Sequence, residues 1–314
     1  MSREVTLRQL EYLVAVADHG SLAAAAHASH VSTAGIASAL NDLEHLVDTP
    51  LTIRTRSKGV VLTAAGRVAV EKARKLLKHS RHFVESVDQE VGRMRGDLRV
   101  GSFTTLSPWV FPLLLEHFST SFPDVALNVT EGGSPQLLER LAVGECDMIV
   151  LFAAHLWTHG SGVRSAGTAP DPEELTVRML HQARPKVIVS AAHPLARRDV
   201  VHLEELRGQP GILLDVNPVR EILTGVLARV GLAQNIRWST PSVNVVRNVV
   251  GRGLAWSILV GMGLADYSPE GRPLAAVPIA DPLPDNGIVA ATMKNIGETP
   301  KVVEAIRVLR DGAA

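Results

Sequence analysis

A block of basic side chains at residues 51–81 is the part of this sequence best suited to bind an anion. It holds nine lysines and arginines and a single acid, Glu71, although the whole chain balances 32 basic against 32 acidic residues. Guanidinium and ammonium groups bind phosphate oxygens, so a localised block in a neutral protein predicts an anionic partner such as a nucleic acid. Charge alone leaves a solvated helix face open as the alternative. The basic members are Arg54, Arg56, Lys58, Arg67, Lys72, Arg74, Lys75, Lys78 and Arg81.

Three helices are predicted ahead of this block. An amphipathic helix is indicated by apolar residues that recur every three or four positions and stop before Gly20, namely Leu7, Leu10, Val14 and Ala17. Ser21 is expected to cap a second helix at 22–28, and Ser32 a third at 33–47. Two helices joined by a tight turn behind a bracing helix form a helix-turn-helix.

The third helix is expected to present a polar face opposite its apolar face. Ile36, Leu40, Leu43 and Val47 fall on the apolar side, and the opposite side carries Ala34, Ser38, Asn41 and His45. After this helix, two β-like runs at 51–54 and 60–62 flank a basic turn at 56–59, which predicts a hairpin able to touch phosphates or enter the minor groove.

The segment resembles the winged helix-turn-helix of LysR-type transcriptional regulators. The likeness rests on the runs LRQLEYLVAVADHGSLAAAA and PLTIRTRSKGVVLTAAG, with Val31-Ser32 and Leu43-Glu44 between them. It implies binding of double-stranded DNA by Ser21, Ser32, Thr33, Ala34, Ser38, Asn41, Arg54, Arg56 and Lys58.

The sequence also departs from that family. Thr33-Ala34 stands where the family commonly has Gln-Pro, and Ser38 where it often has Arg or Lys. The exposed face of the recognition helix therefore has no lysine or arginine. We expect DNA affinity to depend on the wing and the helix N-termini, although Asn can still read adenine.

A long helix is predicted at 63–92, capped by Thr63. Apolar and small residues recur along it in a 3/4 alternation over about three heptads, which favours a partner helix over a surface helix of one domain. The resemblance implies a dimerisation helix, in a homodimer or homotetramer. The predicted seam is Val70, Ala73, Leu77, Ser80, Val84, Val87 and Val91.

The C-terminal two-thirds alternates short apolar runs with helical patterns, which predicts α/β structure with mainly parallel sheets. Ser107, Ser134, Asn217 and Thr240 each precede a proline at the start of a predicted helix. Each is expected to be an N-cap with proline at the first helical position. The pattern is explained either by good capping alone or by several helix N-termini that line one cleft and attract anions.

The resemblance implies the remaining architecture: α/β overall, with an N-terminal, mainly α winged helix-turn-helix at 1–62, a linker helix at 63–92, and an effector domain resembling periplasmic binding proteins. Its two subdomains are expected at 97–170 with 284–314, and at 176–283; the stretch 153–175 matches poorly. A small effector, with an anion as one option, is expected to shift the arrangement of paired DNA-binding domains. The implied contacts are Ser102, Thr104, Thr105, Ser134, Asn217, Pro218 and Ser242.

Other classes find little support. A single cysteine, Cys146, excludes an internal disulfide framework and a Cys-rich zinc site, and is expected to be a structural thiol. The neighbouring histidines His155/His159 and His79/His82 are expected to be solvated, and Gly251-x-Gly253 lacks the rest of a dinucleotide motif. An enzyme or a transport-type binding protein is the alternative class, but no catalytic constellation or secretory signal is readable. We expect no enzyme activity, cofactor or membrane span, a cytoplasmic location, and RNA polymerase as a further candidate partner.

Overall fold

The computed structural model describes residues 4–55, 59–90, 93–157, 170–217, 219–260, 266–283, 287–295 and 297–312. The chain divides into two compact units, one of Met1–Met94 with Ala142–Glu145 and the other of Arg95–Leu141 with Cys146–Ala314. Each unit is described by itself.

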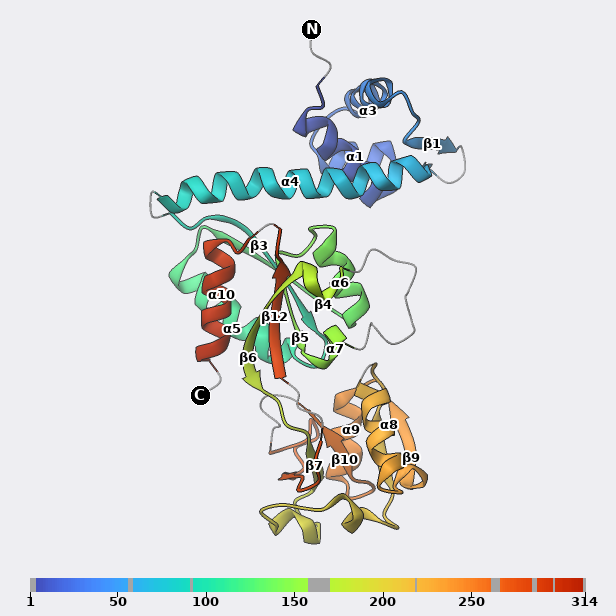
Figure 1. Cartoon of the computed structure of the whole chain (residues 1–314), viewed down its shortest axis with the longest axis vertical. Helices are drawn as coiled ribbons and strands as arrows, with labels where there is room; N and C mark the ends of the chain where they lie inside the picture. The colour runs from blue at the N-terminus through green and yellow to red at the C-terminus, as the bar shows by residue number, and fades with distance from the viewer. Residues whose placement is uncertain are drawn as a thin grey trace. The chain divides into compact units, whose positions relative to one another are not determined.

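The first unit begins with the predicted helix-turn-helix and wing (Figure 1). The second and third helices and their serine caps are confirmed as predicted, because each cap is a local interaction between a hydroxyl and an amide two or three residues later. The elements of this unit are α1 (Leu7–His19), α2 (Leu22–Ala28), α3 (Thr33–Val47), β1 (Thr52–Thr55), β2 (Gly59–Leu62) and α4 (Ala64–Glu90).

The buried face of α1 differs from the predicted one. Leu10, Leu13 and Val16 are buried, whereas Leu7 is 46% exposed. Apolar residues at spacings of three and four form two overlapping stripes along α1. The buried stripe is the one that faces α2, α3 and α4, which all contact α1. The prediction that Leu7 belongs to the buried face was therefore wrong.

The start of α4 is fixed by a close backbone approach. Thr63 caps it, since its Oγ1 accepts a hydrogen bond from Gly66 N at 2.9 Å. A Cβ on Gly66 would lie 2.0 Å from the carbonyl oxygen of Leu51, so only glycine fits there. Val70 and Ala73, the first two predicted seam residues, are buried in this unit. They are unavailable to a second chain, which corrects the predicted seam.

The second unit contains a five-stranded sheet in the order β4-β3-β5-β12-β6. Helices α5 and α10 lie together at one side of it, and α6 and α7 at the other (Figure 1). The strands are β3 (Gly96–Phe103), β4 (Val125–Gly132), β5 (Met148–Phe152), β6 (Leu175–Gln182) and β12 (Gly287–Met293). The helices are α5 (Ser107–Ser121), α6 (Ser134–Ala142), α7 (Ala154–Trp157) and α10 (Pro300–Asp311). Because β6 pairs with β12, the chain leaves this sheet after Gln182 rather than at residue 176.

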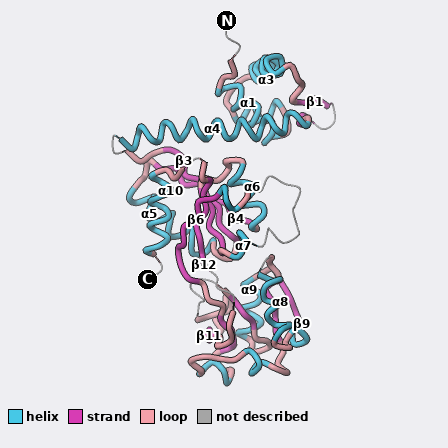
Figure 2. Tube along the Cα trace, viewed as in Figure 1, coloured by secondary structure: helices cyan, strands magenta, loops and turns pink. Residues whose placement is uncertain are grey.

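Two further sheets, ordered β10-β7-β11 and β8-β9, share the remaining cores of this unit with two helices (Figure 2). The strands are β7 (Lys186–Ser190), β8 (Gly211–Leu214), β9 (Ile236–Thr240), β10 (Ser257–Leu259) and β11 (Leu274–Pro278), and the helices are α8 (Val219–Arg229) and α9 (Val243–Gly251). Short 3-10 turns lie at Pro172–Glu174, Pro194–Arg197, Leu203–Leu206 and Ala233–Asn235.

The sheets of this unit contain both parallel and antiparallel pairs, so the prediction of mainly parallel sheets was wrong. Strand β3 pairs in parallel with β4 and β5, and β8 with β9. Antiparallel pairs join β12 to β5 and β6, and β7 to β10 and β11. The reason is topological: β12 and β11 enter their sheets late in the chain, and a sequence of local runs carries no information on strand direction.

Candidate DNA interface and effector site

The recognition helix α3 has the predicted polar face and most of the predicted apolar face. Ile36, Leu40 and Leu43 are buried in the core of the first unit. Val47, which was also predicted on the apolar face, is 44% exposed at the end of the helix, so its prediction was wrong. The predicted DNA contacts on the other side are exposed, as expected for groups that meet a duplex: Ser32, Thr33, Ala34, Ser38 and Asn41.

The serine caps place two helix N-termini on this unit. Ser32 Oγ accepts from Gly35 N at 3.1 Å, and Ser21 Oγ from Ala24 N at 3.1 Å. Unpaired N–H groups and the positive end of the helix dipole at such termini favour phosphate.

The wing is tied to the body of the unit by backbone contacts. Val60 N donates to the carbonyl of Gly20 at 2.8 Å, and a Cβ on Gly59 would lie 2.4 Å from that carbonyl oxygen. Gly59 also has φ +73°, which glycine adopts readily. Arg54 lies in β1 opposite Val60, while its side chain and the residues Arg56 and Lys58 lie outside the described part.

Glu44 is a structural residue of this interface that the sequence reasoning missed. Its Oε1 accepts hydrogen bonds from Leu51 N at 2.7 Å and Thr52 N at 2.8 Å, so it joins the recognition helix to the first wing strand. The Leu43-Glu44 pair is part of the resemblance to the family, but that resemblance did not indicate that Glu44 bonds the wing.

An arginine of α4 makes two ion pairs within the first unit. Arg74 pairs with Asp18 at the end of α1, and its Nη1 lies 2.8 Å from Glu145 Oε1. Its side chain is only 18% exposed. This member of the basic block is therefore occupied by carboxylates, so the block does not act as one phosphate-binding surface.

The first effector-type segment lies between β3 and α5. Ser102 is fully buried, with its Oγ donating to Phe103 O at 3.3 Å, whereas Thr104 is exposed and Thr105 half-buried. Leu106 occupies the cap position of α5 and no side chain caps this helix. Ser107 is instead inside the helix, with its hydroxyl directed to Phe103 O. The predicted cap at Ser107 was wrong, and no side chain caps α5.

The predicted caps at Ser134 and Thr240 were also wrong. Helix α6 starts at Ser134 itself, and α9 is capped by Ser242, whose Oγ accepts from Val245 N at 3.4 Å. Proline lacks an N–H that would be unpaired anywhere in the first helical turn, so it is tolerated at the second helical position as well as the first and does not fix which residue is the cap. The predicted arrangement does occur at Thr299, which caps α10 ahead of Pro300. Asn217 is exposed, and Pro218 lies outside the described residues.

Ser134 is held in a buried aromatic setting. Its Oγ is hydrogen-bonded to His155 Nδ1 at 2.5 Å, and neither side chain has any solvent exposure. The imidazole makes edge contacts with the rings of Phe103 and Phe152, at centroid distances of 4.4 and 5.4 Å. The expectation that His155 is solvated was wrong, because α7 places it against β3 and β5.

Asp215 is a second polar residue that the sequence reasoning missed. It follows β8, and its backbone N donates to Thr240 O at 2.8 Å across to β9. Its carboxylate pairs with Arg220 of α8 at 3.1 Å and accepts from Ser239 at 3.4 Å. A carboxylate therefore lies near the start of α8, beside the predicted contact Asn217.

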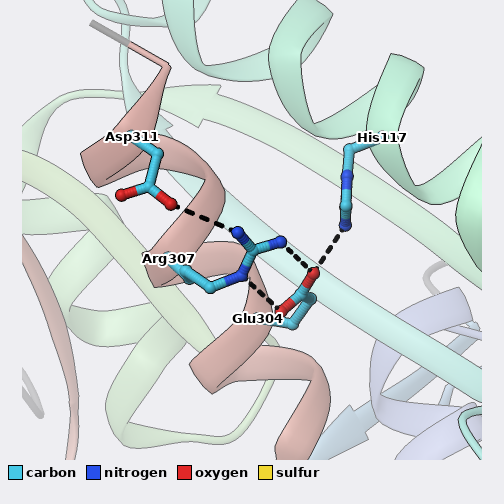
Figure 3. A network of polar contacts seen from close by, with 4 residues as sticks. All are labelled: His117, Glu304, Arg307 and Asp311. Carbon is cyan, nitrogen blue, oxygen red and sulfur yellow. Dashed lines mark hydrogen bonds and ion pairs between the residues drawn. The ribbon is translucent and has the colours of Figure 1, made fainter.

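A polar network of four residues joins α5 to α10 in the second unit (Figure 3). Glu304 accepts hydrogen bonds from Arg307 Nη2 and from His117 Nε2, both at 2.7 Å. The Arg307 bond, followed by the His117 bond, lowers the pKa of Glu304 against the opposing effect of burial. Asp311 completes the network with a 3.2 Å contact to Arg307. The network fixes the C-terminal helix and brings no reactive group together.

Other kinds of site are not evident in the described residues. No group of three or more His, Cys, Asp or Glu side chains within them is arranged to hold a metal ion. Among the helices in those same ranges, none is both long and apolar enough to span a membrane. The single cysteine, Cys146, is not part of a disulfide and is 2% exposed.

A winged helix-turn-helix on one chain with an α/β unit of several sheets defines a class, that of DNA-binding regulators with a ligand-binding domain. Residues 92–314 match the profile described as LysR substrate binding domain, and residues 7–67 match the bacterial regulatory helix-turn-helix protein, lysR family. The chain belongs to the LysR family of transcriptional regulators.

Individual relatives have low sequence identity to this chain, but the matched regions cover most of both proteins. The hydrogen peroxide-inducible genes activator of Pectobacterium carotovorum is 26% identical over 261 residues, covering 83% of this chain and 81% of the relative. HinK, a LysR family regulator from Pseudomonas aeruginosa, is 27% identical with a TM-score of 0.60 and covers 99% of each chain. CbnR, solved with its target DNA, is similar in fold at 23% identity and a TM-score of 0.60, covering 98% of this chain and all of that one.

Proposed function

We propose that the chain is a ligand-responsive, sequence-specific regulator whose effector, bound by the C-terminal domain, shifts the arrangement of paired DNA-binding domains. The domain division proposed is 1–62, 63–92, and two effector subdomains. The observation that carries the ligand-binding part is the turn between β3 and α5, where exposed Thr104 and half-buried Thr105 precede a helix that no side chain caps. Such a terminus favours an anionic or strongly hydrogen-bonding group.

The proposed DNA contacts divide by chemistry. We propose that Ser38 and Asn41, which are exposed on α3, read base edges, and that Arg54, Arg56 and Lys58 of the wing sequence bind phosphates. Ser21, Ser32, Thr33 and Ala34 complete the proposed surface at the two helix N-termini.

The proposed effector contacts divide by exposure. Thr104, Thr105, Asn217 and Ser242 retain some solvent exposure, and the first two are the strongest candidates. Ser102 and Ser134 are fully buried, so we propose that they support the residues that contact the ligand rather than contact it themselves. Pro218 remains a proposed contact on the same loop as Asn217.

We propose pairing of two chains through the outer face of α4. Leu76, Phe83 and Val87 are 53%, 71% and 53% exposed and recur at spacings of seven and four. Such a stripe on a long helix is what a partner helix covers, and a dimer would bind two half-sites. Tetramers are the further option.

We propose small-molecule binding rather than thiol oxidation as the signal. The relative from Pectobacterium is named for hydrogen peroxide induction. This chain has one cysteine, and Cys146 is buried, so one chain cannot form an internal disulfide and the thiol is shielded. A cytoplasmic location and contact with RNA polymerase follow as further expectations of a bacterial DNA-binding regulator.

Two measurements on the full chain test the proposal. Selection from a randomised duplex pool should enrich one sequence, and affinity for it should fall steeply as salt rises. A thermal-shift panel of small carboxylates, phosphate and sulfate should show a rise in melting temperature for a ligand of the native state, lost in Thr104→Ala with Thr105→Ala. No enrichment in the selection would contradict DNA binding, and no shift across the panel would contradict an anionic effector.

A further inference from the structure

The helix-turn-helix of this chain is poor in permanent positive charge. Within residues 4–50, Arg8 is the single lysine or arginine. The same range holds six carboxylates: Glu4, Glu11, Asp18, Asp42, Glu44 and Asp48. A surface that meets a polyanion normally supplies cations, so the charge of residues 4–50 as it stands opposes binding and leaves the wing to supply the permanent cations.

Histidines occupy the outer surface of this same range. His27 lies in the last turn of α2, His30 in the turn between α2 and α3, and His45 on α3 along the face of Ser38 and Asn41. All three are exposed. In a helix-turn-helix the first helix crosses the phosphate backbone and the second enters the major groove, so this turn and face lie near phosphates.

The turn histidine also stands at a conformationally costly position. His30 has φ +54°, in the left-handed region that glycine and asparagine occupy more readily. This conformation closes α2, because His30 N donates to His27 O at 3.2 Å and Val31 N to Ala26 O at 3.0 Å, the two backbone bonds of a left-handed helix C-terminus. The turn thereby fixes the backbone of His30 between α2 and α3 and leaves its side chain exposed.

The surroundings leave these rings available. In the described part of the chain, the imidazoles of His27, His30 and His45 make no hydrogen bond or ion pair. The charged groups on α1, which packs against α2 and α3, are Arg8, Glu11, Asp18 and His19. Those on and after α3 are Asp42, Glu44 and Asp48, of which Asp42 is one helical turn before His45. Asp18 is engaged by Arg74, and Glu44 by the wing.

We propose that His27, His30 and His45, when protonated, supply the cationic phosphate contacts of this helix-turn-helix, so that DNA binding takes up protons and strengthens as pH falls from 8 to 6. The inference rests on the proposed DNA binding. It adds three contact residues and a dependence of DNA affinity on pH.

The size of the effect follows from linkage. Imidazole is half protonated near pH 6.5 in water, and a neighbouring phosphate favours the protonated ring. If the contact favours it tenfold, each histidine tightens binding about sixfold between pH 8 and pH 6, or about two hundredfold for three. Each protonated contact also steepens the dependence of log K on log salt by about 0.9.

The test uses the full chain and a fluorescein-labelled duplex of 40 base pairs and random sequence, titrated by fluorescence anisotropy at pH 6, 7 and 8. The wild type should lose at least tenfold in affinity from pH 6 to pH 8. The triple variant His27→Gln, His30→Asn, His45→Gln should bind weakly with a nearly flat profile; asparagine tolerates the left-handed turn. His202→Gln, an exposed histidine of the second unit, is the matched control and should keep the wild-type slope.

A second variant protects the test against misfolding. His45→Arg places a permanent charge at the same site and should bind more tightly than the wild type at pH 8 with a shallower pH slope. Equal pH slopes in the wild type and the triple variant would overturn the inference. Failure of the wild type to bind any duplex in dilute buffer at all three pH values would instead overturn the proposed function.

Discussion

Ser134 Oγ lies 2.5 Å from His155 Nδ1, and both side chains are fully excluded from solvent. The pair joins the first residue of α6 to α7 through a single hydrogen bond inside an aromatic wall formed by Phe103 and Phe152. It therefore fixes the start of α6 beside the proposed effector contacts.

We predict that Ser134→Ala and His155→Leu each lower the free energy of unfolding of the second unit by about 1–3 kcal/mol, because each leaves one buried polar partner unsatisfied. The double variant should cost less than the sum of the two, since the bond is already lost in either single variant. Urea unfolding of the full chain followed by fluorescence measures this, with the exposed Ser119→Ala as control. Strict additivity would contradict a coupled pair.

The helix-turn-helix was predictable because its signals are local. Ser21 and Ser32 each cap a helix within three residues of themselves, and the apolar face of α3 is set by periodicity alone. The wing was predictable from its basic turn. The start of α5 was not, because whether Leu106 or Ser107 is the last residue before the helix depends on the hydrogen bond of Ser107 to Phe103 O.

The site residues that were missed depend on tertiary contacts. His155 reads as a surface histidine in its own sequence, and its burial comes from β3 and β5. Asp215 meets Ser239 and Thr240 only when β8 pairs with β9. The directions of β11 and β12 also depend on pairing with strands that are distant in the sequence. The local pattern therefore predicted mainly parallel sheets where antiparallel pairs are present.

A glycine pair tests the close approach at the base of the wing. Gly66→Ala should destabilise the first unit by about 1–3 kcal/mol or more, because its Cβ would overlap the Leu51 carbonyl, which already accepts from Thr63 N. Gly225→Ala in α8, where a Cβ meets nothing within 4 Å, should instead stabilise the second unit by about 0.5–1 kcal/mol. Thermal unfolding of both variants gives the comparison. Gly66→Ala with wild-type stability would show that the approach is not constraining.

The α5–α10 network predicts an acid-dependent contribution. Because the folded state lowers the pKa of Glu304, its contribution is present above the ordinary glutamate pKa and is lost as pH falls through the lowered value. Glu304→Gln should therefore reduce the melting temperature by a few degrees at pH 7, on the order of 1 kcal/mol, and the difference should disappear at acid pH.

Melting curves from pH 7 to pH 3 measure this difference. Glu116→Gln, on the exposed side of α5, is the control and should show no such convergence. A constant gap between the wild type and Glu304→Gln at all pH values would contradict the assignment.

The outer face of α4 predicts the assembly state. Leu76→Glu with Phe83→Glu should give monomers in sedimentation velocity, since two charges would have to be buried against a partner helix. Leu254→Glu, a leucine of similar exposure in the second unit, should leave the assembly unchanged. Monomers should also lose most of their affinity for a two-half-site duplex while retaining weak binding to a half-site. An unchanged sedimentation coefficient would place the dimer contact elsewhere.

Substitutions of Arg54 and Asn41 should have different effects: the first should change the affinity for any DNA, and the second the preference for one DNA sequence. Arg54→Ala removes a wing cation, so it should weaken binding to specific and scrambled duplexes alike and reduce the salt slope by about 1. Asn41→Ala removes an exposed amide on the recognition face, so it should weaken binding to the selected duplex by about 1–3 kcal/mol and leave the scrambled one almost unchanged. Gel-shift titrations of both variants against both duplexes at two salt concentrations distinguish the roles. Equal losses on the two duplexes in both variants would mean that α3 and the wing do not divide base reading from phosphate binding, and that shape or water-mediated contacts carry the preference.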